Sequence, residues 1–327
     1  MNNCTPTESL LSKPQFVYIT LHCFTFLEIF LHSFGAYCIF YKTPKSMKSV
    51  KWTMLNLHFW TVVLDFCFSM FLTPYMTLPA LAGYTFGLFS YFGLDMAFQV
   101  YFQFSVAFTV GASICVLLES RYFLFIGGSI WSKLRIPYHI LSYTFSFTFM
   151  IPQLTIMLPD QQSAIATFTY LLPCSIGLTR PVFGLNLSSE FNYLVIVVVS
   201  YNLHLFCIGV YFGFALHFHF AKMKLTSKLT VSLQSRLQIA MIIQISIPVT
   251  VLVGPVAYAV LSVLSGYHNQ ELNNIAIIFA SCHGMVSTFA MLVIHHPYRL
   301  AVVQLIPELD KYLTDNNNRN RVMSVVL

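Results

Sequence analysis

Long apolar runs separated by short polar segments dominate this chain. A helix that rises about 1.5 Å per residue needs about 20 apolar residues to cross hydrocarbon about 30 Å thick. Strands are disfavoured, since the spans of a β-barrel have about ten residues with strict alternation. The pattern therefore predicts an all-α membrane protein, a bundle of seven transmembrane helices. The expected spans are 16–41, 53–76, 97–120, 138–158, 193–220, 239–265 and 274–295.

Basic residues give the expected orientation of this bundle. Of the 17 Lys and Arg residues, all but Lys13 and Arg180 follow the first, third or fifth span or lie in the C-terminal tail. Loops rich in Lys and Arg stay in the cytoplasm. We therefore expect an extracellular N-terminus over residues 1–15, a membrane domain over 16–295 and a cytoplasmic tail over 296–327.

The segments expected outside carry candidate modification sites. Asn3 and Asn186 each begin an Asn-x-Ser/Thr triplet, so both are candidate glycosylation sites. Of the eight cysteines, only Cys4 and Cys174 fall on the oxidising side of the membrane. That placement leaves a Cys4–Cys174 disulfide open.

Composition excludes several classes of protein. Hydrophobic residues make up 57% of the chain and charged residues only 9%, against about 25% charged in soluble domains, so the lipid bilayer is the expected solvent. The net charge of +6 comes from basic clusters beside apolar runs, and no nucleic-acid partner is expected. Motifs typical of hydrolases, metalloproteases and phosphate-binding loops are missing from the sequence, so neither an enzyme nor a cofactor is expected. His217 and His219 lie two residues apart, the wrong helical spacing for two metal ligands on one face.

Ionisable residues inside the expected spans are costly and therefore informative. Asp65 lies near the middle of the second span, with His58 on the same face, and Glu28 shares a face of the first span with His32. One interpretation is a polar core that repacks when the bundle changes state. The other is static hydrogen bonding between helices, worth about 0.6 kcal/mol per contact. A transporter or channel with a proton relay of Glu28, Asp65 and histidines is the alternative function.

Two further features could belong to a conformational switch. Glu119 and Arg121 lie at the inner end of the third span, where an ion pair could hold the helix in one arrangement. Pro248 and Pro255 each remove a backbone hydrogen bond from the sixth span and favour a kink. Commonplace charges at a helix end and fixed packing of the prolines are the competing explanations.

Short strings along the whole chain carry a family resemblance. They are the run 42–51 that leads into Trp52–Trp60, Pro74-Tyr75, Pro79, Ala82-Gly83, Glu119-x-Arg121-Tyr122, Asn269–Asn274, His283-Gly284 and His295–Arg299. In this order the strings closely resemble the nematode serpentine receptors of class h. The resemblance implies a GPCR-like fold and a chemosensory receptor in the plasma membrane of a sensory neuron or cilium. Its implied partners are a small odorant-like or pheromone-like ligand and a heterotrimeric G protein.

By analogy with rhodopsin-like receptors, the resemblance also implies an activation switch. Its residues are Glu119, Arg121 and Tyr122 at the ionic-lock position, Asp65 of the second helix, Pro248, and His296, Pro297, Tyr298 and Arg299 in place of the usual Asn-Pro motif. The chain departs from that pattern at the seventh helix and has no cysteine at the outer end of the third span.

A ligand pocket is expected between the outer halves of the third, fifth, sixth and seventh spans. The candidate lining residues combine aromatic rings with a few polar groups, as a small organic ligand requires. They are Gln99, Tyr101, Gln103, Tyr201, Asn202 and Tyr258. Packing between helices is the competing explanation for each of them.

Overall fold

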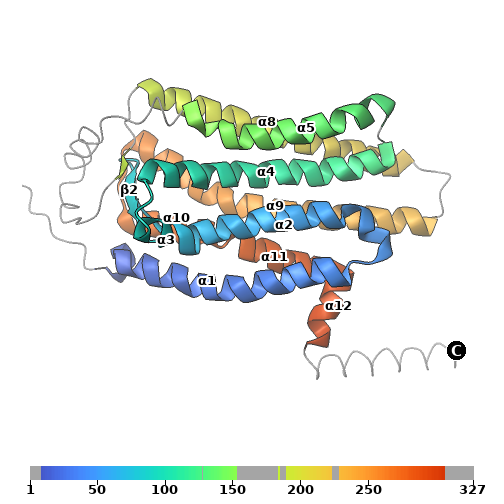
Figure 1. The fold of residues 1–327 in the computed structure, drawn as a ribbon, viewed down its shortest axis with the longest axis horizontal. Coiled ribbons are helices and arrows are strands. Elements are labelled where there is room, and N and C mark those ends of the chain that lie inside the picture. The colour runs from blue at the N-terminus through green and yellow to red at the C-terminus, as the bar shows by residue number, and fades with distance from the viewer. Residues whose placement is uncertain (1–8, 127, 153–182, 185–188, 223–227, 306–327) are drawn as a thin grey trace, which may run out of the picture.

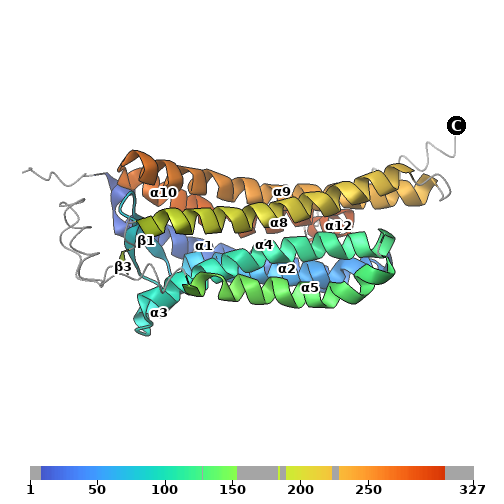
Figure 2. The same ribbon diagram turned by 90° about the horizontal axis from the view of Figure 1, so that it is seen from above.

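The computed structural model describes residues 9–126, 128–152, 183–184, 189–222 and 228–305. Its long helices run side by side along one axis (Figure 1). They are α1 (Pro14–Tyr37), α2 (Lys48–Phe66), α4 (Met96–Ile126), α5 (Ser129–Thr148), α8 (Ser189–Lys222), α9 (Lys228–Ser265), α10 (Gln270–Ser281) and α11 (His283–Ile294). Seen from above, α5 and α9 lie on opposite sides of the bundle (Figure 2).

Short elements join and extend these helices. They are η1 (Leu10–Ser12), η2 (Cys38–Lys42), η3 (Lys45–Met47), η4 (Cys67–Phe71), α3 (Leu88–Tyr91) and α12 (His296–Gln304). The helix α12 follows α11 directly and runs across the bundle axis rather than along it (Figure 1).

Among the described residues, six helical segments are long and apolar enough to cross a membrane. They are 14–42, 48–71, 96–125, 199–219, 238–265 and 270–294. The helix α5 occupies the place of the expected fourth span, but it begins at Ser129, before the expected start at residue 138. Its first turns include Lys133 and Arg135, which lower its hydropathy, and it packs along α4 within the bundle.

The second span ends earlier than the sequence pattern predicts. The expected helix reached Met76, but α2 ends at Phe66, and the π-helical turn η4 continues it only to Phe71. The cause is Pro74, which disfavours helical geometry at the residue before it. Thr73 itself has a positive φ of 49°, outside the right-handed helical region.

A small antiparallel sheet is the one departure from an all-α chain among the described residues. Its strands are β1 (Pro74–Thr77), β2 (Ala82–Thr85) and β3 (Phe183–Gly184), in the order β1-β2-β3. Tyr75 pairs with Tyr84 across the first ladder. The sheet lies at the end of the bundle opposite α12 (Figures 1 and 2).

Apolar side chains fill the centre of the bundle between α1, α2, α4 and α11. Buried members include Val50, Met54, Leu64, Val106, Leu117 and Met291. This core surrounds several buried polar side chains, and those polar groups form the candidate site.

Candidate functional site

Asp65 of α2 is fully buried and joins three helices. Its Oδ2 accepts a hydrogen bond from His32 Nε2 of α1 at 3.0 Å. Its Oδ1 lies 2.9 Å from His283 Nδ1 and accepts the backbone N–H of Gly284 at 3.1 Å, both from the start of α11. A buried carboxylate is stable only when its oxygens are satisfied, and here both oxygens are.

The break between α10 and α11 makes this arrangement possible. Cys282 separates the two helices, so Gly284 lies in the first turn of α11, where backbone N–H groups have no partner inside the helix. A Cβ at Gly284 would overlap the carboxylate of Asp65. Glycine is therefore required at this position for the close approach of α2 and α11.

His32 extends the cluster to a second contact with α11. Its Nδ1 lies 2.9 Å from Thr288 Oγ1, and its backbone carbonyl accepts a hydrogen bond from His58 Nε2 at 3.1 Å. Gly35, one turn further along α1, would place a Cβ 2.8 Å from Thr288 Cγ2. We call Asp65, His32, His58, His283 and Thr288 the polar core.

Glu28 lies beside the polar core without joining its hydrogen bonds. Its Oε2 accepts from Ser69 Oγ at 2.5 Å, and Thr25 Oγ1 donates to the Ser69 carbonyl at 3.0 Å. Glu28 and His32 of α1 are both buried, as are His58 and Asp65 of α2, which agrees with the shared helical faces expected from the sequence. The sequence did not indicate His283, Gly284 and Thr288 as partners, although His283-Gly284 is one of the family strings. No group of three or more His, Cys, Asp and Glu residues among those described could hold a metal ion.

Glu119 is held by the neighbouring helix α5. Its Oε2 forms an ion pair with Arg135 Nε at 3.1 Å and contacts His139 Nε2 at 2.9 Å. Trp131 Nε1 donates to the other carboxylate oxygen at 2.8 Å. Residues two apart on a helix project in nearly opposite directions, so the carboxylate faces α5 while Arg121 faces elsewhere.

Arg121 is fully buried near the inner end of α4. Its guanidinium lies 5.1 Å from the centre of the Phe125 ring. The next residue, Tyr122, packs against Tyr211 and Phe212 of α8, with ring centres 6.0 and 5.2 Å away. Tyr122 therefore packs against α8, whereas the carboxylate of Glu119 contacts α5.

The string His296–Arg299 opens α12 beside the loop between α1 and α2. Tyr298 is fully buried, and its hydroxyl lies 2.8 Å from Thr43 Oγ1. Burial raises the pKa of this tyrosine above its ordinary value. One residue upstream of the string, His295 Nε2 contacts Gln244 Oε1 of α9 at 2.8 Å. This end of α11 is thus tied to both α9 and the loop between α1 and α2. Pro248 lies within α9, which continues through it.

The predicted ligand residues fall into separate groups. Tyr201 Oη contacts Ser146 Oγ at 2.9 Å, and its ring packs in a buried cluster with Phe108 and Phe149. Tyr101 packs against this cluster and donates to the Phe147 carbonyl at 2.7 Å. Gln99 is buried and accepts from Thr85 Oγ1 at 2.8 Å near the sheet. Tyr258 donates to Asn273 Oδ1 at 2.7 Å.

The two remaining ligand candidates differ from these four. Gln103 has a buried Oε1 that lacks a hydrogen-bond partner in the described part of the chain. The backbone of Asn202 lies in α8, and its side chain is outside the described features. Gln103 is thus a predicted ligand residue whose side-chain oxygen is not engaged by another described residue.

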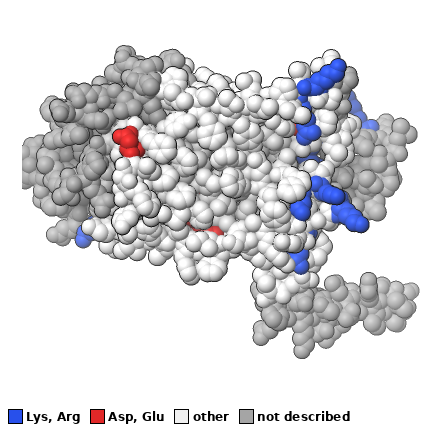
Figure 3. Space-filling view, in the orientation of Figure 1, with Lys and Arg blue, Asp and Glu red and all other residues white. Residues whose placement is uncertain are grey.

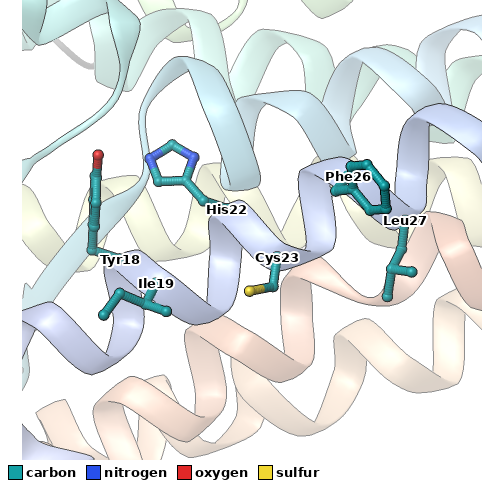
Figure 4. Close-up of a pocket in the computed structure, with 6 residues that line it drawn as sticks. All are labelled: Tyr18, Ile19, His22, Cys23, Phe26 and Leu27. Carbon is teal, nitrogen blue, oxygen red and sulfur yellow. The ribbon is translucent and has the colours of Figure 1, made fainter.

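An open hollow of about 710 Å³ lies on α1 (Figure 4). Its lining residues all belong to that helix and are Tyr18, Ile19, His22, Cys23, Phe26 and Leu27. It shares none of them with the predicted ligand set, so this hollow lends that set no support.

His268 and the family string 269–274, at the start of α10, fasten the β1–β2 segment to that helix. The carbonyl of Leu78 accepts from His268 Nδ1 at 2.6 Å and from Asn273 Nδ2 at 3.2 Å. Gln270 Nε2 donates to the Met76 carbonyl at 3.0 Å. We call these contacts the outer clamp.

Two further bonds tie the N-terminal segment to the same region. Tyr75 Oη donates to the Ser12 carbonyl at 2.9 Å, and Asn274 Nδ2 donates to the Leu11 carbonyl at 2.7 Å. Burial raises the pKa of Tyr75 to about 12, so the phenol stays protonated as a donor. The candidate modification sites Asn3, Asn186, Cys4 and Cys174 lie outside the described residues.

Comparison with known proteins identifies the family. The model of the family described as serpentine type 7TM GPCR chemoreceptor Srh matches residues 12–308. Serpentine receptor class H-72 of Caenorhabditis elegans is 26% identical over 305 residues, which cover 91% of this chain and 88% of that receptor. The resemblance noted in the sequence and the seven-helix fold are thereby confirmed. This multi-pass membrane protein belongs to the Srh family of serpentine seven-transmembrane chemoreceptors.

Proposed function

We propose that this chemoreceptor binds a small external ligand and activates a heterotrimeric G protein by rearranging its helices around Asp65. The observation that carries the proposal is the set of bonds from Asp65 to His32, His283 and Gly284, which join α1, α2 and α11. Membership of a chemoreceptor family supports the receptor function in general. The sensory neuron or its cilium is the expected location.

The polar core has the properties of a two-state element. Its bonds all cross between helices, so small shifts of α11 against α1 and α2 would exchange their partners. Packed interfaces of this kind convert small displacements into discrete rearrangements. A ligand shifts such an equilibrium only by binding one arrangement more tightly than the other.

His32 contacts two other helices through its two ring nitrogens. Its Nε2 faces Asp65 Oδ2 of α2, and its Nδ1 faces Thr288 Oγ1 of α11. The Nε2 atom of His283, by contrast, lacks a hydrogen-bond partner among the described residues. His32 therefore couples the position of α11 to Asp65.

The signal would leave the receptor at the end that carries the basic residues. Lys and Arg side chains gather where α12 lies (Figure 3), which supports the orientation expected from the loops. Arg121 lies in α4 near this end, and Glu119 is held away from it by α5. We propose that Arg121 becomes exposed to the G protein when the inner ends of the helices separate.

The test is ligand-independent nucleotide exchange, since the ligand is unidentified. Purified receptor in nanodiscs would be mixed with a panel of Gα subunits, and the basal exchange rate compared between parent and Asp65→Asn. We expect the variant to change that rate several-fold, because an amide has one acceptor oxygen where the carboxylate of Asp65 uses two. Asp95→Asn is the matched control, since this acid is exposed and caps the start of α4 through Ala97 N–H.

Two outcomes would refute the proposal. One is a folded Asp65→Asn receptor whose exchange rate equals that of the parent with a Gα subunit that the parent activates. The other is proton flux through parent-containing vesicles that Asp65→Asn abolishes, with no Gα activated by either protein. The second outcome would favour the alternative of a relay through Glu28, Asp65 and the histidines.

A further inference from the structure

A basic and aromatic patch lies where α1 ends, α2 begins and α12 starts. Its basic members are Lys42, Lys45, Lys48 and Lys51 of the first inner loop with Arg299 of α12. We call these five residues the inner-loop patch. The segment from residue 42 to residue 51 contains no acid that could neutralise it.

The helix α12 brings Arg299 to the loop. It packs against η2, which contains Lys42, and Tyr298 beside Arg299 contacts Thr43 as described above. Tyr298 is buried, so the contact fixes the start of α12 to the loop. The loop lysines and Arg299 thus belong to one structural unit.

Aromatic side chains hold part of the patch at the level of the bundle's end. Lys51 Nζ donates to the Phe40 carbonyl at 2.7 Å and lies 5.7 Å from the centres of both the Phe40 and Trp52 rings. Trp52 is 65% exposed and Tyr41 is 77% exposed. Exposed tryptophan and tyrosine at the end of a membrane helix lie at the lipid headgroups, so the patch faces lipid as well as water.

Lys45 and Lys48 are exposed and available to a ligand. The described ion pairs involve neither of them, and neither side chain makes a hydrogen bond to another described residue. Two free lysines beside Lys42, Lys51 and Arg299 give a multivalent positive site. A multivalent anion complements it better than a single charge does.

We propose that the inner-loop patch binds the headgroup of a multiply phosphorylated phosphoinositide from the adjoining leaflet. Lysine clusters directly beside a membrane helix attract such lipids, each lysine contributing about fivefold in affinity. A lipid fits this patch better than a protein partner because the exposed rings of Tyr41 and Trp52 flank it. The inference goes beyond the proposed signalling function and requires neither the ligand nor the G protein.

The test is binding of fluorescent phosphatidylinositol bisphosphate to full-length receptor in phosphatidylcholine nanodiscs. Lys45→Gln/Lys48→Gln should weaken binding about 25-fold, from two lysines at about fivefold each. Lys45→Arg/Lys48→Arg keeps both charges and should stay within about twofold of the parent, as each charge is retained. Lys133→Gln removes an exposed lysine of α5 on the same side of the membrane and should leave the affinity unchanged.

Three results would overturn the inference. The first is equal affinity of the parent and Lys45→Gln/Lys48→Gln. The second is that phosphatidylserine, at matched total charge, competes as effectively as the bisphosphate lipid does. The patch would then attract anionic lipids through its overall charge and would not recognise one headgroup. The third is equal binding of soluble inositol trisphosphate, which would mean that a free phosphate compound and not a membrane lipid is the ligand.

Discussion

Asp65 of α2 acts as an N-cap for α11, because its Oδ1 accepts the Gly284 N–H at 3.1 Å. A cap normally comes from the residue that precedes the helix. Here it comes from another helix 219 positions away in sequence, so it joins two helices as well as stabilising one. The negative carboxylate also meets the positive end of the α11 dipole.

Gly284→Ala tests how tightly α2 and α11 must approach. The added Cβ would overlap the Asp65 carboxylate, so the helices must separate. We expect a loss of about 1–3 kcal/mol in stability, as for other overpacked cores, measured as a lower thermal unfolding temperature in nanodiscs. Gly213→Ala in α8 is the control, because a Cβ there meets nothing within 4 Å. A Gly284→Ala receptor as stable as the control would contradict the observed approach.

The link between His32 and Asp65 can be measured as a coupling energy. Removing either partner leaves the other with an unsatisfied buried polar group, which costs about 1–3 kcal/mol. The variants His32→Ala and Asp65→Asn should therefore each destabilise the receptor, and the double variant should lose less than their sum by about 0.5–3 kcal/mol. Effects that simply add would mean that the two side chains act independently.

Glu119 should behave as a partner of α5 rather than of Arg121. We expect Glu119→Ala and Arg135→Ala to be coupled in a thermal-unfolding cycle, because their side chains lie 3.1 Å apart. The cycle of Glu119→Ala with Arg121→Ala should show coupling below about 0.5 kcal/mol, the range of independent sites. The reverse order of the two coupling energies would restore the pairing expected from the sequence.

Arg121→Ala separates signalling from folding. If Arg121 contacts the G protein, the variant should reach the cell surface and lose about tenfold or more in nucleotide exchange, as expected for a lost charged contact worth at least about 1.4 kcal/mol. Surface labelling of intact cells supplies the control for expression. Exchange at the parental rate in a receptor that is present at the surface would remove Arg121 from the switch.

The outer clamp should order the sheet. Asn273→Ala removes the bond to the Leu78 carbonyl and the acceptor for Tyr258. We expect the backbone amides of residues 74–85 to exchange with deuterium at least about fivefold faster, the effect of one lost hydrogen bond of about 1 kcal/mol. Asn56→Ala removes a side-chain bond to Tyr143 in the bundle and should leave these amides unchanged. Unchanged exchange in Asn273→Ala would show that the sheet is stable without the clamp.

The helical bundle could be predicted because the length of an apolar run is a local property of the sequence. The end of α2 could not be placed from hydropathy alone, since residues 72–76 are largely apolar although the strand β1 begins at Pro74. The sheet escaped prediction for a different reason, because β2 pairs with Phe183 far along the chain.

The candidate site was predicted only where partners share a helix. Helical spacing placed Glu28 and His32 on one face, but it could not reveal His283 as a partner of Asp65. The same limitation applies to Glu119, because its partner Arg135 comes from the following helix and spacing within one helix cannot indicate it.

The seventh span consists of two helices that meet at Cys282, and each is fastened to a different part of the receptor. The outer piece, α10, is bound to the hairpin through Asn273, while the inner piece, α11, is bound to Asp65 through Gly284. A continuous straight helix would transmit a displacement along its full length. A jointed span can pivot instead, so a displacement at the end of the bundle that carries the sheet would reach the end that carries α12 as a change of angle.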